Sequence, residues 1–248
     1  MNAPPPRIGP PKLRRRQAPS GFDILLVLLA SVAVLCVWIV LSNGLEGLLR
    51  PLLEGNEVST QTRIIGFLGV YYLSLLPVIH VIVLRRRGLI WKDLGLRPAA
   101  PQWYRRAIWV ALLTFALATV LSILVQRLVG RPLDNPQDAI LAADGLSTGS
   151  FLAMLLVVAG LAPLVEELLF RGLVYAWIRC YLGILPAATI SAALFASMHA
   201  IPSLIPSIFA MGVILALLYE RSGSLWPAVI VHGCHNAITL VLHALTIE

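Results

Sequence analysis

Two adjacent glutamates interrupt a long apolar stretch of the sequence. No charged residue occurs from Gly145 to Val165, and then Glu166 and Glu167 appear together, with Arg171 shortly after them. A charged side chain at the centre of a bilayer costs about 3 kcal/mol on insertion scales, so such residues require a structural or chemical reason. A carboxylate held in a dry site is a candidate general base that can activate a water molecule.

The two glutamates differ in their expected surroundings on a helix. Glu167 and Arg171 stand four residues apart, on one helix face, where they can neutralise each other. Glu166 points about 100° away around the helix and has no such partner. We therefore predict that Glu166 is the water-activating base and that Glu167 mainly supports Arg171.

Histidines and one asparagine are the next polar residues inside the apolar segments. His199 follows Phe195 by one helical turn, and Asn236 follows His232 by one turn. A His/Asn pair on one helix face offers two hydrogen-bond donors aimed at one point, which suits a developing oxyanion. His80 and His243 lack such a pattern and are interpreted as packing residues.

These residues must be positioned by helices in a membrane. Of the 248 residues, 58% are hydrophobic and only 12% are charged, whereas soluble domains carry about 25% charged residues. The sequence predicts an all-α fold, a polytopic membrane helical bundle of about seven transmembrane helices, with an eighth segment left open. The expected spans are Phe22–Ser42, Ile64–Leu84, Ala107–Val129, Ser150–Arg179, Leu185–Ile201, Pro206–Tyr219 and Leu225–Leu245.

Charge distribution predicts the domain limits and the orientation. Residues 1–20 are basic and Pro-rich and read as a disordered tail, residues 21–248 as a single transmembrane domain, and residues 150–245 as its catalytic core. The tail and the basic connector Arg85–Arg106 are expected on the cytoplasmic side, and the acidic loop Gly130–Gly149 outside. We expect a multi-pass protein of a prokaryotic inner membrane.

Several other intramembrane chemistries do not match the sequence. It contains no H-E-x-x-H zinc-protease motif and no G-x-S-x-G nucleophile elbow. No pair of membrane aspartates is present that could form an aspartic dyad. The two glutamates are the only acids deep within a predicted span.

Three motifs in order on successive late helices resemble those of the CAAX-protease and bacteriocin-processing (CPBP, or Abi) family. That family includes the type II CAAX prenyl endopeptidases. The motifs are Glu166-Glu167-x-x-x-Arg171, Phe195-x-x-x-His199 and His232-x-x-x-Asn236.

The resemblance implies an intramembrane endopeptidase with its site in a cavity between helices. Glu166 would activate water that His199 holds, and His232 with Asn236 would bind the oxyanion. Glu167 and Arg171 would shape and neutralise the site. Members have been described both as metalloproteases and as metal-independent glutamate proteases. A divalent metal such as zinc, held by Glu166, His199 and His232, is therefore one expectation, and direct activation of water is the other.

The expected partners are the lipid bilayer and a protein or peptide substrate, prenylated or membrane-anchored, and not nucleic acid. Two alternatives to a protease stay open. One is a proton-coupled membrane transporter, because intramembrane Glu and His also build proton relays. The other is a non-catalytic scaffold of the same fold, serving in bacteriocin immunity or regulation.

Overall fold

The structure is a computed structural model that describes residues 19–49, 59–130 and 147–246. This part of the chain is a bundle of helices, and six of them are long and apolar enough to cross a membrane. The predicted all-α membrane bundle is confirmed. The elements are α1 (Gly21–Leu49), α2 (Thr60–Ile79), η1 (His80–Arg85), η2 (Trp91–Leu94), α3 (Pro101–Val129), α5 (Thr148–Leu155), η3 (Leu156–Leu161), α6 (Ala162–Glu167), η4 (Leu168–Tyr175), α7 (Ala176–Arg179), α8 (Ile184–Met198), η5 (Pro202–Leu204), α9 (Ile205–Ser222) and α10 (Trp226–Thr246).

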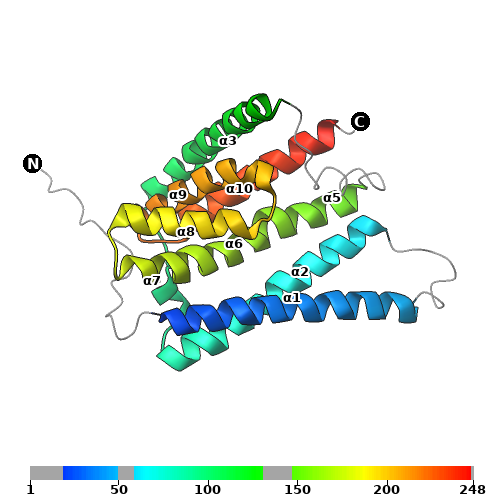
Figure 1. Ribbon diagram of the computed structural model, residues 1–248, viewed down its shortest axis with the longest axis horizontal. Coiled ribbons are helices and arrows are strands. Elements are labelled where there is room, and N and C mark those ends of the chain that lie inside the picture. The colour runs from blue at the N-terminus through cyan, green and yellow to red at the C-terminus, as the bar shows by residue number, and fades with distance from the viewer. Residues whose placement is uncertain (1–18, 50–58, 131–146, 247–248) are drawn as a thin grey trace, which may run out of the picture.

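The helix that carries the glutamates lies in the middle of the bundle. The consecutive elements α5, η3, α6, η4 and α7 form one continuous span, Thr148–Arg179. Helix α2 packs against α1 on one side and against this central span on the other. Helices α8, α9 and α10 cover the opposite side, and α3 packs on α9 and α10 at the edge of the bundle (Figure 1).

Two predicted limits need correction, those of the fifth span and of the basic connector. The expected fifth span, Leu185–Ile201, is a shorter apolar helix that ends at Met198. Helix α3 begins at Pro101, so Arg105 and Arg106 are helical residues and not part of the connector. The first turn of α3 is polar and aromatic, so a search for apolar residues does not detect it. The proline at its first position is a typical signal for the start of a helix. Most of the predicted tail, residues 1–20, and most of the acidic loop, residues 130–149, lie outside the described residues.

One end of the bundle gathers the arginines and is tightly tied together. Arg97 Nε donates to the carbonyl of Gly223 at 2.7 Å, and the Leu225 amide donates to the carbonyl of Gly95 at 2.9 Å. At the start of α1, Arg87 Nε donates to the buried Asp23 carboxylate at 2.7 Å. The connector after η1 is therefore fixed against the turn between α9 and α10. We call this the arginine-rich end.

The central span departs from a regular α-helix on both sides of the glutamates. Elements η3 and η4 are π-helical and flank the short α6. Pro163 has no N–H to give to the carbonyl four residues earlier, that of Ala159, which disturbs the hydrogen-bond ladder here. Such irregular turns are frequent at functional sites because they re-aim side chains and free carbonyl groups.

Helix α10 approaches the irregular turn η3 closely at Gly233. A Cβ atom added to Gly233 would lie 2.3 Å from the carbonyl oxygen of Ala159, a backbone atom that cannot rotate away. Glycine is thus required for the packing distance, and this distance sets how near His232 and Asn236 come to Glu166.

Replacing Gly233 by alanine is expected to force α10 away from η3. Overpacking of this kind costs about 1–3 kcal/mol, so Gly233→Ala should lower the melting temperature of the detergent-solubilised protein. Gly66→Ala on α2 is the matched control, because nothing lies within 4 Å of its added Cβ. Equal melting temperatures for the two variants would contradict the close packing of α10 on η3.

Candidate active site

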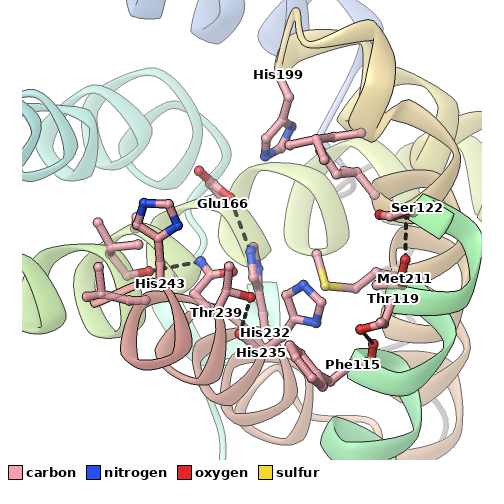
Figure 2. Close-up of a pocket in the computed structure, with 18 of the residues that line it drawn as sticks. Phe115, Thr119, Ser122, Glu166, His199, Met211, His232, His235, Thr239 and His243 are labelled. Atoms are coloured by element: carbon pink, nitrogen blue, oxygen red, sulfur yellow. Dashed lines mark hydrogen bonds and ion pairs between the residues drawn. The ribbon is translucent and has the colours of Figure 1, made fainter. Parts of the chain in front are cut away.

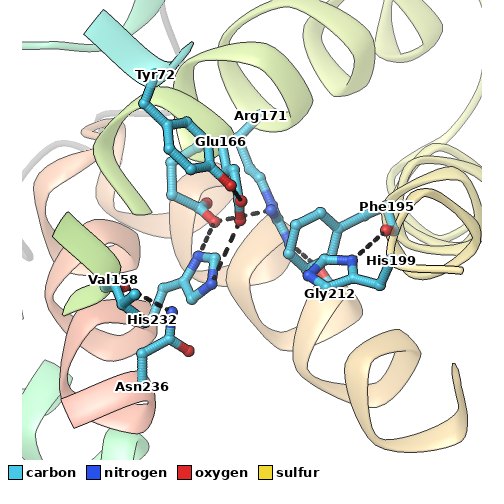
Figure 3. A network of polar contacts seen from close by, with 10 residues as sticks. Tyr72, Val158, Glu166, Arg171, Phe195, His199, Gly212, His232 and Asn236 are labelled. Carbon is cyan, nitrogen blue, oxygen red and sulfur yellow. Dashed lines mark hydrogen bonds and ion pairs between the residues drawn. The ribbon is translucent and has the colours of Figure 1, made fainter. Parts of the chain in front are cut away.

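Glu166 faces a cavity and is held from two sides. The Tyr72 hydroxyl on α2 donates to Glu166 Oε1 at 2.5 Å. The other carboxylate oxygen, Oε2, lies 3.6 Å from Nε2 of His232 on α10. The Glu166 side chain is 16% exposed, so it is reachable from the cavity yet largely surrounded by protein (Figure 3).

Glu167 points into the core and is fully buried. Its Oε1 accepts from Arg171 Nη1 at 2.8 Å and lies 3.0 Å from His232 Nδ1. The ion pair with Arg171 has the predicted four-residue spacing. Glu167 is therefore already committed to two partners, whereas Glu166 keeps an oxygen directed toward the cavity.

Arg171 connects the central span to two further helices. Its Nη2 donates to the carbonyl of Gly212 on α9 at 3.1 Å. The guanidinium also lies over the Phe195 ring of α8, 4.6 Å from the ring centroid. Arg171 is 1% exposed, so its guanidinium has lost its contacts with water. The carbonyl, the carboxylate and the ring compensate for that loss.

His232 lies between the two glutamates. A carboxylate only accepts hydrogen bonds, so the contact with Glu167 places a proton on Nδ1 of His232. The Nε2 atom is thereby directed toward Glu166. Phe195 packs edge-on against His232, with ring centroids 5.6 Å apart, which restricts the orientation of the imidazole.

His199 enters the cavity from the end of α8. Its Nδ1 lies 2.9 Å from the Phe195 carbonyl oxygen, which can only accept, so Nδ1 carries the proton. The neutral ring then has Nε2 as a hydrogen-bond acceptor. Helix α8 stops here because Ala200 adopts a left-handed conformation with φ of 53°, an unusual one for a residue with a Cβ. Figure 2 shows His199 and Glu166 facing each other across the cavity.

Asn236 lies one turn beyond His232 on α10. Its Nδ2 donates one hydrogen to the carbonyl of Val158 in the π-helical η3 at 2.9 Å. The amide nitrogen carries a second hydrogen. Asn236 thus holds α10 against η3 and retains a donor group at the cavity wall.

All these polar groups border one cavity of about 590 Å³, a typical size for a ligand-binding pocket. The structure places Glu166, His199, His232 and Asn236 in its lining. Glu167 and Arg171 are not in the lining; they lie behind it, in the core.

Tyr72 and His235 border the cavity beside the predicted residues, although the sequence analysis gives neither of them a role. Tyr72 lies on α2, a span in which no motif is matched. Its position on the face of α2 that packs against the bundle is the one signal that could have identified it. His235 also borders the cavity, with its ring 5.8 Å from that of Phe115 on α3. No motif marks His235 in the sequence, because the residue one turn after it is Thr239 and not Asn.

A divalent metal is the cofactor that the resemblance raises. His199 and His232 each direct Nε2 toward the cavity, and Glu166 directs Oε2 there, which are suitable donor types. Across residues 19–49, 59–130 and 147–246, however, no three His, Cys, Asp or Glu side chains are grouped so that they could hold a metal ion. The donor set in this conformation does not fit a three-ligand metal site.

The late helices match the model of a known protein family. Residues 148–238 match the family model described as type II CAAX prenyl endopeptidase Rce1-like. This segment of the chain is similar to that family. The match spans all three motifs, confirms the resemblance read from them, and supports a CAAX-protease-type membrane protein at the level of the family. Searches of curated proteins and of solved structures found no match.

The buried ion pair yields a prediction about stability. Glu167→Gln leaves the Arg171 charge without its carboxylate, and breaking a buried pair in this way costs about 3–5 kcal/mol. We expect a clear drop in the melting temperature in detergent, and partial recovery when Arg171→Met is added.

The control is Glu220→Gln, which weakens the ion pair with Arg179, where the two side chains are 34% and 13% exposed. A partly exposed pair contributes less than a fully buried one, and the glutamine oxygen can still accept from the Tyr175 hydroxyl. This variant should therefore melt closer to the parent protein than Glu167→Gln does. A melting temperature of Glu167→Gln equal to that of Glu220→Gln would show that Glu167 does not neutralise Arg171.

Proposed function

We propose that the chain is an intramembrane endopeptidase in which Glu166 activates a water molecule. One observation carries this proposal. Of two adjacent glutamates, only Glu166 borders the cavity, and the same cavity is lined by His199, His232 and Asn236. The Rce1-like match over residues 148–238 supports the same class of enzyme.

In the first step, Glu166 takes a proton from water while the water oxygen attacks the carbonyl carbon of the peptide bond. His199 Nε2 accepts a hydrogen bond from the same water and orients it. The tetrahedral intermediate then collapses, the C–N bond breaks, and Glu166 returns the proton to the leaving nitrogen. The products are a new carboxyl terminus and a new amino terminus, so atoms and charge balance.

The oxyanion of the intermediate would be held by His232 and Asn236. Because His232 Nδ1 is bound to Glu167, Nε2 can donate only when the ring is protonated. The remaining amide hydrogen of Asn236 would supply the second donor, and preorganised donors of this kind are effective in a dry site.

The alternative with a metal would use Glu166, His199 and His232 as ligands and would require His199 to move toward the other two. The alternatives without proteolysis differ more clearly. A proton carrier needs Glu166 but releases no peptide, and a scaffold needs no ionisable Glu166 at all.

The substrate is proposed to be a membrane-anchored protein or peptide, and a prenylated tail remains one candidate. We propose that the protein lies in a prokaryotic inner membrane. Its N-terminus and the arginine-rich end are expected on the cytoplasmic side, because Lys and Arg favour that side.

The central test is Glu166→Gln, which keeps the shape of the side chain and removes its basicity. Peptides released from membranes that contain the parent protein should disappear in the variant, with a loss of at least a hundredfold by quantitative peptidomics. The variant should still insert and melt normally. Glu220→Gln, the same substitution outside the cavity, should release the parental peptides. Unchanged peptide release from Glu166→Gln would exclude the proposed mechanism.

Tyr72 is proposed as a positioning residue that fixes the Glu166 carboxylate. A hydrogen bond to a charged group contributes about 1.5–3 kcal/mol, so Tyr72→Phe should lower kcat by roughly tenfold to a hundredfold and change KM little. Tyr71→Phe is the control, because Tyr71 has an edge contact with Tyr72 but no hydrogen bond to Glu166 in the described chain. Equal kcat values for the two variants would remove Tyr72 from the mechanism.

A further inference from the structure

The cavity extends from Glu166 in one direction only. On α3 its lining runs from Phe115 to Gln126, and on α10 it runs from His232 to His243. At a rise of 1.5 Å per residue, each stretch covers about 16 Å along the helix. In α3 these residues lie in the half away from the arginine-rich end. In α10 they begin about two turns after the helix start and continue toward its opposite end.

The opposite direction is closed by packed side chains. Between Glu166 and the arginine-rich end, the core contains Leu168, Tyr175, Tyr219 and Leu225, none more than 1% exposed. Arg171 itself fills the space behind Glu167. At the far end of the cavity, Ile123, Gln126 and Thr239 are exposed, whereas Leu240 is buried and His243 is half-buried. The cavity therefore opens away from the arginine-rich end.

The walls of the cavity differ in chemistry. On one side, α2, α5 and η3 contribute the apolar side chains of Ile64, Leu68, Met154 and Val158. On the other side, α3 and α10 contribute hydroxyl, amide and imidazole groups beside the apolar Phe115, Ala118 and Ile123. Figure 2 labels Thr119, Ser122, His235, Thr239 and His243 of this wall. The polar groups are those of Thr119, Ser122, Gln126, His235, Thr239 and His243.

A cavity with one apolar wall and one mixed wall that carries hydrogen-bonding groups matches an extended polypeptide. Such a segment has peptide groups that need partners, because an unpaired peptide group in a dry environment is costly. Its apolar side chains can lie on the other wall. At about 3.3 Å per residue, a length of about 16 Å accommodates about five residues in extended form.

We propose that this cavity is the binding channel for an extended peptide segment that enters from the membrane face opposite the arginine-rich end. With the arginine-rich end in the cytoplasm, the segment enters from the outer face. The substrate is then a membrane-anchored protein cut on its outer side, at a bond about five residues within the channel. This inference rests on the proposed endopeptidase function. It adds the membrane face from which the substrate enters and the extended form in which it binds.

The test labels single cysteines from a defined side. Cys36, Cys180 and Cys234 are first replaced by alanine, in a form that still releases peptides. Gln126→Cys then places a thiol at the far end of the channel, and Lys92→Cys, on the exposed surface of η2, marks the arginine-rich end. A bulky membrane-impermeant maleimide is added to intact cells or to inverted membrane vesicles, and Glu166-dependent peptides are quantified afterwards.

The proposal expects Gln126→Cys to react in intact cells and Lys92→Cys to react only in inverted vesicles. Modified Gln126→Cys should release peptides at least tenfold more slowly. Leu128→Cys, at the same end of α3 but outside the cavity lining and 87% exposed, should be modified without loss. The cut sites should fall on the outer side of the substrates' membrane spans.

Three results would overturn the channel while leaving the protease intact. They are modification of Gln126→Cys only from the side that modifies Lys92→Cys, unchanged peptide release after its modification, and cut sites on the cytoplasmic side of the spans. By contrast, if no Glu166-dependent peptides are detected before labelling, the proposed function itself is overturned, and the substrate channel with it.

Discussion

The burial of Arg171 is the constraint on which the rest of the site depends. A guanidinium that is 1% exposed in an apolar bundle needs a counter-charge and hydrogen-bond acceptors. It finds the carboxylate of Glu167, the carbonyl of Gly212 and the ring of Phe195. These partners lie on α6, α9 and α8, so one cation joins three helices that are separate in the sequence.

The same interaction separates the roles of the two glutamates. Adjacent residues on a helix point about 100° apart, so Glu167 can reach the core only if Glu166 faces elsewhere. Glu167 is shared by Arg171 and His232 and fixes the imidazole, as a carboxylate does in many catalytic arrangements. Glu166 is left at the cavity, held by Tyr72 and close to His232.

The asymmetry of the bundle has a packing origin. Toward the arginine-rich end, large buried side chains and the fixed connector leave no space. Toward the other end, the irregular turn η3 and the close approach of Gly233 to Ala159 bring α10 beside the central span, and α3 remains at the edge. A channel on one side of the charged core follows from that arrangement, together with the polarity of the walls that α3 and α10 provide.

The sequence by itself determined the class of the molecule, the approximate spans and the residues with chemical potential. Low charge and long apolar runs are sufficient for the first two, because a bilayer restricts each span to a helix of defined length. The spacing of Glu167 and Arg171 was likewise sufficient for their ion pair, since it is a contact within one helix. The limits of α3 and α8 were less accessible, because polar or kinked turns carry little periodic signal.

The tertiary structure alone decided which residues from different helices meet. The contacts of Tyr72 with Glu166 and of His232 with Glu167 join positions 94 and 65 residues apart. No local pattern encodes them, because they depend on how ridges of one helix fit the grooves of another. The same holds for Gly233, whose need to be glycine follows only from the position of the Ala159 carbonyl. The direction in which the cavity opens is likewise set by which half of the bundle is densely packed, a property of the assembled helices and not of any one of them.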